Sequence, residues 1–447
     1  MFSTEDTIVA IATPPGRGAI GIVRLSGPTS VSIAAALAWR DRFEPRHATL
    51  AHVHDAQGAT IDHAIVTVFP APHSYTGDDV AEISAHGSQI VLHAIVDAAL
   101  AAGARLAHPG EFTFRAYLNG RIDLVQAEAV GDLIEAITPL QARVAFDQLQ
   151  GTLTHRLATM EGRLLDLIAK LEASLDFPDE GYHFITPDET SVQLAAIVAD
   201  LDALLADAHR GRLIREGLTA VVVGRPNAGK SSLFNRLAGS ERAIVTDIPG
   251  TTRDLVTERV DVEGIPFTIV DTAGIHEQAA DAIEEEGLAR ARQARAIADV
   301  LIVVVDSSVP LTAADHELLS STATRPRVVA ASKADLPPAW TPGAYGATSV
   351  SSLTDVGIDA LRAELLRAAG IEPRQDPAAV VNLRHAALLR GARDAASRAR
   401  DAAAAGVAEE FVLADLHHAR GCFDEVTGAR TADDVLRLIF ERFCIGK

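Results

Sequence analysis

The pattern of apolar and polar positions changes its periodicity several times along the 447 residues. Over residues 1–118, short β-rich runs alternate with turn residues, and one helical pattern covers Ser88 to Ala102. The runs are Thr7 to Ala12, Ala19 to Leu25, Ile61 to Phe69 and Val80 to Ala85. Short strands interleaved with turns and a helix predict a compact α+β domain.

Long helical segments follow this first stretch. From Val125 to Leu213, amphipathic patterns rich in Ala, Leu, Glu and Arg predict helices, and the same texture returns from Val380 to the end. A polar segment, Arg210 to Gly217, and a Pro-containing linker, Gly370 to Pro377, separate these helical segments from the residues between them. We therefore expect a multidomain chain: an α+β domain over 1–118, a discontinuous α-helical domain over 119–214 and 373–447, and an α/β domain over 215–372 inserted into it.

A glycine-rich segment carries the strongest chemical signal. Residues 224–231, Gly-Arg-Pro-Asn-Ala-Gly-Lys-Ser, follow the apolar run Leu218 to Val223 and precede a helical pattern. Glycines let the backbone N–H groups converge on phosphates, Lys230 adds a positive charge, and Ser231 offers a hydroxyl to Mg²⁺. This pattern predicts a nucleotide-phosphate loop.

Two later segments favour GTP over other ligands. Asp271 to Gly274 follows the apolar run Phe267 to Val270 and has the form of a segment that reaches Mg²⁺ and the γ-phosphate. Ser332 to Asp335 follows a third apolar run, and the Asp335 carboxylate suits the two N–H donors that guanine presents and adenine lacks. Segments of this kind at strand ends predict a Ras-like P-loop GTPase domain.

The segment Ala243 to Asp254 lies between the phosphate loop and Asp271 and is expected to act as a switch. Thr252 is our choice for the threonine that closes over the γ-phosphate and Mg²⁺, with Thr251 as the alternative. Ile275 stands where many GTPases have the glutamine that orients water, so hydrolysis needs another group. Carboxylates at 284–286 are candidates, although such a run is also typical of a solvated helix face.

Composition limits the setting and the partners. Two cysteines make no disulfide framework, no signal peptide is evident, and no apolar run approaches the roughly 20 residues that span a bilayer. We expect a cytoplasmic protein with no membrane partner and no DNA partner. A net charge of −20 and 4% aromatic residues mean that any RNA contact is local or shared with a partner.

Several motifs together resemble the MnmE (TrmE) family of tRNA-modifying GTPases. Inside the α/β domain they are the phosphate loop with Asn227, the loop 246–254 and the aliphatic Ile275. Outside it they are residues 13–18, 21–27, 75–79, 86–87, 109–113, 123–129 and 176–180 and the terminal Phe-Cys-Ile-Gly-Lys of 443–447. The resemblance thus covers essentially the whole chain.

The resemblance implies a K⁺-stimulated GTPase with a defined set of ligands. K⁺ is expected on Asn227 and on the backbone oxygens of Thr246, Ile248 and Thr251; Mg²⁺ on Ser231 and Thr252; and Glu284 is the implied catalytic glutamate. The expected GTP-binding residues are Asn227, Ala228, Gly229, Lys230, Ser231, Ser232, Thr246, Asp247, Ile248, Pro249, Gly250, Thr251, Thr252, Asp271, Thr272, Ala273, Gly274, Lys333, Asp335, Ser351 and Ser352.

The resemblance also implies a tetrahydrofolate site for the 5-formyl or methylene form. The positions are Arg24, Glu82, Arg121 and Lys447, which by residue type alone would be ordinary surface or salt-bridge residues. Cys444 is a candidate catalytic residue on the same ground, whereas its apolar neighbours favour a small buried packing residue.

This chain departs from the usual motifs at several positions, including Ser351-Ser352-Leu353, where Ser-Ala-Lys is usual and backbone N–H groups do most of the binding. Ser332 opens the guanine-binding motif where asparagine is usual, so we expect guanine specificity with lower affinity. Arg121 replaces a common lysine, which keeps the charge and changes the donor geometry.

By resemblance, the chain is a homodimer joined through its amino-terminal domains that works with the flavoprotein MnmG in a heterotetramer or larger complex. The pair would add an aminomethyl or carboxymethylaminomethyl group to the wobble uridine of certain tRNAs, with FAD on the partner only. The alternative is a ribosome-assembly or regulatory GTPase without modification activity, which would not bind folate. A structural helical scaffold is disfavoured by the intact Lys230, Ser231, Thr252 and Asp271.

Overall fold

The computed structural model describes residues 5–176, 184–239, 256–271, 298–371 and 380–446. Contacts between residues divide the chain into two compact units. The first comprises Met1–Gly131, Gln148–Ile197 and Gly391–Lys447, and the second comprises Asp132–Asp147 and Val198–Arg390. Each unit therefore combines segments that are distant in the sequence.

The first unit contains a six-stranded sheet in the order β3-β4-β5-β2-β1-β6. All neighbouring strands are antiparallel except β1 and β6, which are parallel. The strands are β1 (Ile8–Ile11), β2 (Ile20–Ser26), β3 (Thr49–His54), β4 (Thr60–Phe69), β5 (Val80–His86) and β6 (Arg105–Leu106). The edge strand β3 and the central β2 thus lie far apart in the sheet and close in the sequence.

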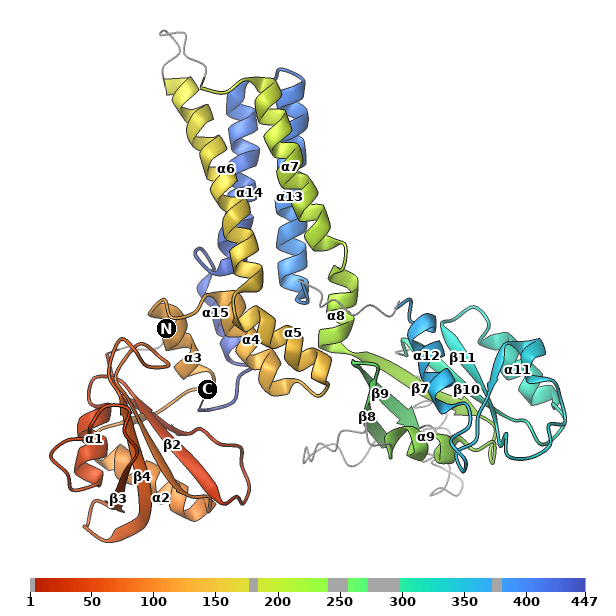
Figure 1. The fold of residues 1–447 in the computed structure, drawn as a ribbon, viewed down its shortest axis with the longest axis horizontal. Helices are drawn as coiled ribbons and strands as arrows, with labels where there is room; N and C mark the ends of the chain where they lie inside the picture. Colours follow the sequence, from red (N-terminus) through yellow and green to blue (C-terminus); the bar gives the residue numbers. More distant parts are fainter. Residues whose placement is uncertain (1–4, 177–183, 240–255, 272–297, 372–379, 447) are drawn as a thin grey trace. The chain divides into compact units, whose positions relative to one another are not determined.

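Helices α1 (Ser30–Leu37) and α2 (Gln89–Ala101) pack on this sheet (Figure 1). Alternate strand residues such as Val23, Val66 and Ile83 are buried in the core beneath them. The intervening residues point the other way, so Leu50 and Ile65 are exposed on the opposite face. This is the alternation expected of an antiparallel sheet with one packed face.

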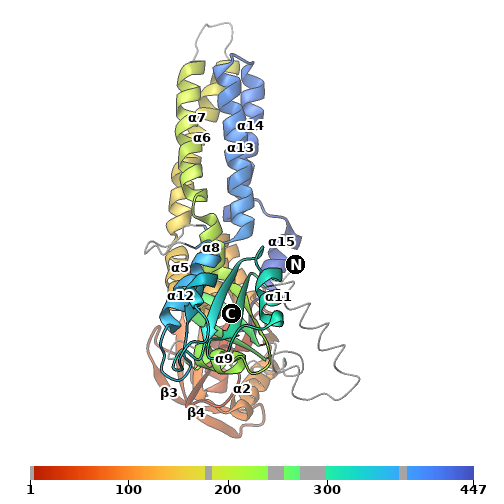
Figure 2. The ribbon, with the colours of Figure 1, turned by 90° about the vertical axis from the view of Figure 1, so that its right-hand side faces the viewer.

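The helical part of the first unit centres on two long helices, α6 (Thr152–Asp176) and α14 (Glu409–Thr427), which pack along each other (Figure 2). Buried residues of α6 recur every three or four positions, as in Leu157, Met160 and Leu164. Shorter helices α3 (Glu111–Leu118) and α15 (Asp433–Phe440) complete this unit. Helices that contribute residues to both units are α4 (Leu124–Glu135), α5 (Pro139–Leu149), α7 (Pro187–Leu205) and α13 (Leu383–Ala404).

The second unit contains a six-stranded sheet in the order β12-β11-β10-β7-β9-β8, parallel except for β8. Its strands are β7 (Leu218–Gly224), β8 (Val256–Val262), β9 (Ile265–Asp271), β10 (Val300–Asp306), β11 (Arg327–Ser332) and β12 (Ala347–Ser349). Its helices are α8 (Ala208–Glu216), α9 (Lys230–Ala238), α11 (Ala313–Ser321) and α12 (Ile358–Ala368), with a 3₁₀ turn, η3, at Pro342–Tyr345.

Apolar clusters cover both faces of this second sheet. Val222 and Ile302 belong to one cluster, and their strand neighbours Val221 and Val303 belong to the other. Strands buried on both faces require near-continuous apolar runs, which is why β7 and β11 were recognisable from sequence. The predicted architecture, an α+β amino-terminal part, a discontinuous helical part and an inserted α/β P-loop sheet, is confirmed.

Across the described ranges, no helix combines the length and the apolar character needed to cross a bilayer.

Candidate functional site

The phosphate loop, residues 224–231, connects β7 to α9 through backbone conformations that the sequence dictates. Gly229 is the N-cap of α9 with a φ of 88°, and Asn227 has a φ of 62°. A Cβ on Gly224 would lie 2.4 Å from the Val304 carbonyl oxygen of β10, so the neighbouring strand admits only glycine there. The loop therefore ends on the amino terminus of a helix, whose free N–H groups and dipole suit an anion.

Lys230 is buried at the start of α9, with 7% of its surface exposed. Its ammonium donates a 2.8 Å hydrogen bond to the Arg225 carbonyl oxygen. Burial lowers the pKa of Lys230, and the nearby Asp271 carboxylate partly opposes this effect. The ammonium is thus held inside the loop, where a phosphate would compensate its lost hydration.

Other predicted residues lie around Lys230. Ser231 and Ser232 are exposed in the first turn of α9, and Ala228 is buried. Asp271 is buried at the end of β9. The donor chemistry fits Mg²⁺, because a hydroxyl and a carboxylate are hard oxygen ligands.

Arg225 is a loop residue whose side chain was not singled out from sequence. Its guanidinium donates to the Thr312 hydroxyl at 2.9 Å and to the Asp315 carboxylate at 3.0 Å. Thr312 and Asp315 also form the capping box of α11. The Thr-x-x-Asp spacing was visible in the sequence, but its arginine partner, about 90 positions earlier, was not.

The base loop, residues 332–335, follows β11 and is joined to the phosphate loop. The buried Ser332 hydroxyl donates to the Ala228 carbonyl oxygen at 2.6 Å, and the Val305 carbonyl oxygen lies at 3.2 Å. A hydroxyl carries one proton and an amide NH₂ carries two, so serine can fully satisfy only one of these carbonyls. Serine therefore keeps a link between the loops, with one donor fewer than asparagine would bring.

Two further contacts orient the base loop. Lys333 has a φ of 59°, and its ammonium lies 2.6 Å from the Asp306 carboxylate at the end of β10. Asp335 accepts a 2.6 Å hydrogen bond at Oδ1 from the fully buried Ser351 hydroxyl, which in turn accepts from the backbone N–H groups of Leu353 and Thr354. Ser352 is half-buried beside them. The structure thus brings the predicted Ala228, Lys333, Asp335 and Ser351 together and adds Asp306, which sequence reasoning missed.

Part of the predicted nucleotide site lies outside the described residues. These positions are Thr246, Asp247, Ile248, Pro249, Gly250, Thr251, Thr252, Thr272, Ala273, Gly274 and Glu284. Of the K⁺ positions, Asn227 is described, and it is exposed in a left-handed conformation. Its amide oxygen has suitable chemistry for a cation.

The first unit holds the second set of predicted residues. Arg24 of β2 and Glu82 of β5 are cross-strand partners, and the Arg24 Nε donates to the Glu82 carboxylate at 2.8 Å. Their side chains are 15% and 23% exposed. The guanidinium also lies 5.4 Å from the ring centre of Tyr75 and 5.8 Å from that of Phe112. The cation is therefore close to two aromatic rings, and a small part of its side chain stays exposed.

The carboxyl-terminal tail packs against the same region through backbone contacts. A Cβ on Gly446 would lie 2.3 Å from the Ile11 carbonyl oxygen, and one on Gly110 would lie 2.5 Å from the Phe440 carbonyl oxygen. The Gly446 carbonyl oxygen lies 3.5 Å from an Arg24 nitrogen. The backbone of the tail therefore packs closely against the residues around Arg24.

The remaining predicted residues of the first unit have different surroundings. Cys444 is exposed, which contradicts the packing interpretation, whereas burial raises the pKa of the Cys422 thiol. Arg121 is exposed beside the loop that carries Tyr75, since a Cβ on Gly77 would lie 3.3 Å from its Cγ. Lys447 lies outside the described residues.

A buried ion network lies at the other end of β1. Arg115 and Glu111 are fully buried. Arg115 Nη2 lies 2.6 Å and Arg105 Nε 2.8 Å from the Asp6 carboxylate, and both arginines also contact the Glu111 carboxylate. The hydrogen bond from Arg105 is the main cause that lowers the pKa of Asp6; burial opposes it and Arg115 adds to it. These groups satisfy one another and indicate a structural role.

No cluster of three or more His, Cys, Asp or Glu side chains suited to a metal occurs among the described residues. The second unit has a cavity of about 750 Å³ whose lining includes Asp132, Arg215 and Arg259. It contains none of the predicted nucleotide residues, so it is not the candidate site.

Family models match the chain over both of its non-GTPase parts. The model described as GTP-binding protein TrmE N-terminus matches residues 7–121, and the MnmE helical domain matches residues 124–444. A protein named tRNA modification GTPase MnmE from Koribacter versatilis is 45% identical over 461 residues, covering 100% of both chains. One of the same name from Azoarcus sp. is 45% identical, covering 99% of this chain and 98% of the relative.

Among solved structures, the G domain of the FeoB iron transporter of T. maritima is 23% identical and covers 34% of this chain and 98% of that one, with a TM-score of 0.27. The full-length relatives and the matches to both family models carry the assignment. The chain belongs to the MnmE (TrmE) family.

Proposed function

We propose that this chain is a tRNA modification GTPase, an enzyme that hydrolyses GTP in the course of modifying tRNA. The observation that carries the proposal is the meeting of the phosphate and base loops at the carboxyl ends of parallel strands, joined by the Ser332 hydroxyl. Ligands of doubly wound sheets bind at this edge. The proposal that the substrate is tRNA is supported by the names of the full-length relatives.

The proposed GTP complex follows from the described groups. The phosphates lie on the N–H groups of α9, with the Lys230 ammonium exchanging the Arg225 carbonyl for a phosphate oxygen. Asp335, fixed at Oδ1 by Ser351, accepts the guanine N1–H and amine. Ser231 and Thr252 would hold Mg²⁺, which would neutralise charge on the phosphates. The stem of Lys333 covers the base while Asp306 holds its ammonium.

Hydrolysis is proposed to use K⁺ and Glu284 in place of a glutamine and an arginine finger. Asn227 and the backbone oxygens of Thr246, Ile248 and Thr251 would hold the K⁺, which would supply positive charge to stabilise the transferred phosphoryl group. Rates of GTP hydrolysis in K⁺ and in Na⁺, for the wild type and Asn227→Ala, test this step. Equal rates in both salts for the wild type would remove K⁺ from the mechanism.

In the first unit, Arg24, Glu82, Arg121 and Lys447 are proposed to bind tetrahydrofolate in its 5-formyl or methylene form. A cation held over Tyr75 suits a folate carboxylate, and a carboxylate suits the pterin N–H groups. Cys444 is the proposed nucleophilic group of the tail, since its sulfur is exposed. Calorimetry with 5-formyltetrahydrofolate tests the site, and the absence of binding would favour a regulatory GTPase.

The proposed reaction adds an aminomethyl or carboxymethylaminomethyl group to wobble uridine. The chain acts as a homodimer with the FAD-bearing MnmG, in the cytoplasm. Deletion of the gene in its host should remove this nucleoside from digested tRNA, as measured by mass spectrometry. Expression of the wild-type protein in the deletion strain should restore the modified nucleoside, and expression of Lys230→Ala should not. An unchanged nucleoside profile after deletion would contradict the proposal.

A further inference from the structure

The end of β10 is hydrogen-bonded to the first residue of the base loop, Ser332. Asp306 is the last residue of β10 and is the register partner of Ser332 in β11. Ser307, which follows it, is 2% exposed, and its hydroxyl donates to the Ser332 carbonyl oxygen at 2.6 Å. The backbone N–H of Ser307 donates to the same oxygen at 3.0 Å. One buried serine therefore fixes the start of the base loop through two hydrogen bonds.

The second residue of the base loop, Lys333, is held by the Asp306 carboxylate. Its ammonium donates to Oδ2 of Asp306 at 2.6 Å, while Oδ1 accepts from the Ser308 hydroxyl at 2.6 Å and from the Ser308 backbone N–H at 2.9 Å. Burial raises the pKa of Asp306, but the hydrogen bonds from Lys333 and Ser308 outweigh it, so the pKa lies below its usual value. Asp306 is thus a fixed anion at neutral pH, and both of its oxygens are occupied.

Trp340 brings the chain back to the same strand end after the base loop. Its indole N–H donates to the Asp306 carbonyl oxygen at 2.9 Å, and the Ala339 N–H donates to the Ser307 carbonyl oxygen at 2.7 Å. The indole packs against the apolar cluster on one face of the sheet and meets the Tyr345 ring edge-on at a centroid distance of 5.7 Å. Both ends of the base loop are therefore fastened to the end of β10. We call Asp306, Ser307 and Trp340 the β10 clasp.

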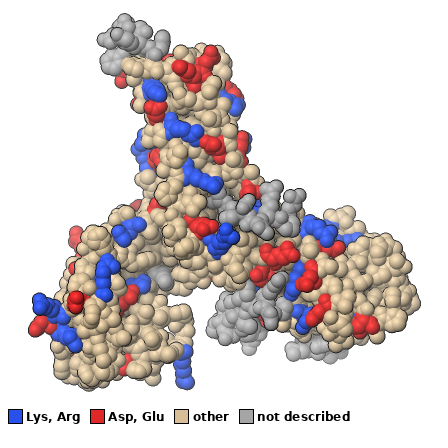
Figure 3. Space-filling view, in the orientation of Figure 1, with Lys and Arg blue, Asp and Glu red and all other residues tan. Residues whose placement is uncertain are grey.

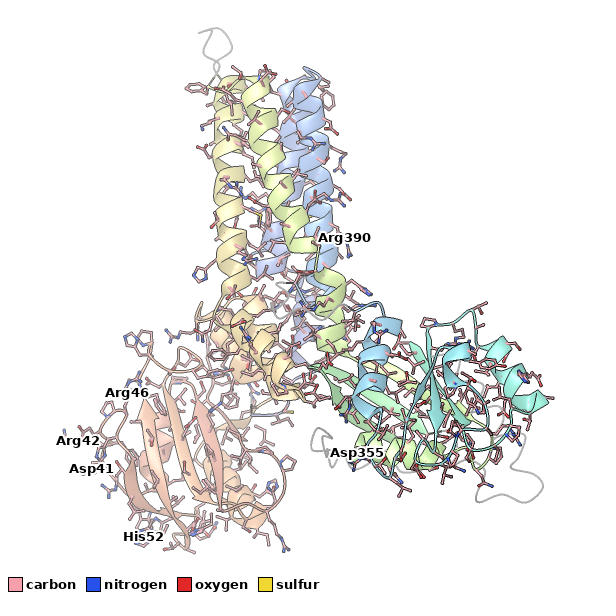
Figure 4. The ribbon with its side chains drawn as sticks, turned by 45° about the vertical axis from the view of Figure 1, so that its right-hand side comes forward. Asp41, Arg42, Arg46, His52, Asp355 and Arg390 are labelled. Carbon is pink, nitrogen blue, oxygen red and sulfur yellow. The ribbon has the colours of Figure 1, made fainter. Side chains whose placement is uncertain are left out.

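Asp355, on the loop that precedes α12, makes a contact of a different kind. This residue, labelled in Figure 4, pairs with Arg236 of α9 while the two side chains stay 52% and 40% exposed. Ion pairs that remain in solvent contribute little to stability. On the face shown in Figure 3, positive and negative side chains are interspersed over both units, so that face offers no field of one sign to orient Lys333 from a distance. The buried contacts of the β10 clasp are therefore the stronger means of holding the base loop.

The β10 clasp offsets the donor that Ser332 lacks. An asparagine amide has two N–H donors, whereas a hydroxyl has one, which Ser332 gives to the Ala228 carbonyl oxygen at 2.6 Å. The Ser307 hydroxyl and the Trp340 indole are side-chain donors that act on the neighbouring backbone from the side of β10. The base loop is thus held from two sides, by Ser332 on the phosphate loop and by the clasp on β10.

We propose that Ser307 and Trp340 are positioning residues for guanine. They hold Lys333 and Asp335 where the base binds, in place of the second donor of an asparagine at position 332. The inference deepens the proposed function and rests on it, because it takes the base to be the guanine of GTP. A loop that is fixed beforehand loses less conformational freedom when the ligand binds, so damage to the clasp should lower nucleotide affinity and leave phosphoryl transfer unchanged.

Release of a fluorescent GDP analogue, followed by stopped flow on the full-length chain, tests the β10 clasp. Trp340→Phe keeps an aromatic ring and removes the indole N–H, so release should be about threefold to tenfold faster. Ser307→Ala should speed release about threefold, because the backbone N–H still holds the Ser332 carbonyl. Asp299→Asn, at the other end of β10, is the matched control. Its carboxylate also accepts a backbone N–H, from Thr219 at 2.8 Å, and this variant should release GDP as the wild type does.

Steady-state kinetics separate positioning from general damage to the fold. In Trp340→Phe and Ser307→Ala, kcat at saturating GTP should stay within about twofold of the wild type while KM rises. The preference for GTP over ITP, whose base lacks the exocyclic amine, should fall about threefold, because Asp335 is no longer aimed at both guanine donors. A lower kcat with an unchanged preference would overturn the positioning role.

A double-mutant cycle tests whether the β10 clasp replaces the missing donor. In a Ser332→Asn background, Ser307→Ala and Trp340→Phe should speed release by clearly smaller factors than in the wild type, because the amide then supplies the second donor. Factors that are the same in both backgrounds would overturn the compensation.

The remaining outcomes separate this inference from the proposed function. A wild-type chain that binds neither GDP nor GTP would overturn both. Nucleotide binding by the wild type, with unchanged release in Trp340→Phe and Ser307→Ala, would overturn the β10 clasp alone and leave the GTPase intact.

Discussion

The nucleotide loops of the second unit and the Arg24 site of the first unit are built in opposite ways. In the second unit, each functional group lies within a few residues of a strand end, and backbone conformation does most of the positioning. In the first unit, Arg24, Glu82 and Gly446 come from widely separated segments and meet only in the folded sheet. Phosphates can be bound by a local motif, whereas the second site exists only through tertiary structure.

The two regions also differ in how their charges are held before a ligand arrives. The Lys230 ammonium donates to a backbone carbonyl, which is a weak partner that an anionic phosphate can replace. Arg24 is already paired with a carboxylate and enclosed by two rings. We therefore expect substitutions to act sharply on nucleotide turnover and more gradually on the first-unit site.

Lys230→Ala should produce the largest effect. Removing the buried ammonium should lower GTP hydrolysis on the order of 100-fold, since a hydrogen bond to a charged group contributes up to about 3 kcal/mol. Folate binding by the first unit should be unchanged, as measured by calorimetry. Lys170→Ala on α6 is the control, and equal GTPase losses in both variants would contradict a specific role of the loop.

Gly446→Ala should affect the first unit alone. The new Cβ would lie 2.3 Å from the Ile11 carbonyl oxygen at a φ of 97°, so the tail must move away. We expect about tenfold weaker folate binding, in line with roughly 1–2 kcal/mol of strain, and normal GTP hydrolysis.

Gly103→Ala provides the matched control for this change. Gly103 also has a positive φ, 102°, but a Cβ there would meet no atom within 4 Å. It shares the backbone strain and lacks the clash with the tail. If both variants lost folate binding equally, docking of the tail would not be the cause.

Ser332→Asn should tighten nucleotide binding, with a smaller effect than the two substitutions above. A second N–H donor can reach both the Ala228 and Val305 carbonyl oxygens, so GDP release should slow about threefold to tenfold. Ser332→Ala should speed release by a similar factor, because it leaves a buried carbonyl without its donor. The rate of GDP release can be measured by stopped flow with a fluorescent GDP analogue, and Ser320→Ala, at an exposed serine, is the control. Equal release rates in all variants would contradict a role of the Ser332 hydrogen bond.

Asp6→Asn should give the smallest effect, a loss of stability that is present at neutral pH and disappears in acid. Since the folded-state pKa of Asp6 lies below its ordinary value of 3.8, its contribution to stability is present above about pH 4 and is lost as the pH falls through the folded pKa. Urea unfolding of the first unit should therefore depend less on pH below 4 in the variant. Asp315 also has a lowered pKa: burial opposes this shift, and hydrogen bonds from Thr312 and Arg225 outweigh it. Asp315→Asn should change the pH dependence of unfolding in the second unit instead. If both variants changed the unfolding of the same unit in the same way, local ion pairs would not be the cause.

The same contrast explains what could be predicted from sequence. The strands β7, β9 and β11 were identified correctly from their apolar runs, because burial on both faces of a sheet imposes a local pattern. The Arg225 contact with Asp315 and the Lys333 contact with Asp306 were missed, because these partners are set by strand order, not by spacing. Arg24 and Glu82 were singled out by resemblance alone; their pairing required the β2–β5 register.

The division of the chain also has a consequence during synthesis. Domains fold as units while the chain emerges from the ribosome. The first unit needs Gly391–Lys447, including the Gly446 contact with β1, whereas every segment of the second unit has been made by Arg390. The half of the molecule that is translated first is therefore the last to be completed, and premature termination near the tail would spare the nucleotide loops and leave the amino-terminal sheet without its closing segment.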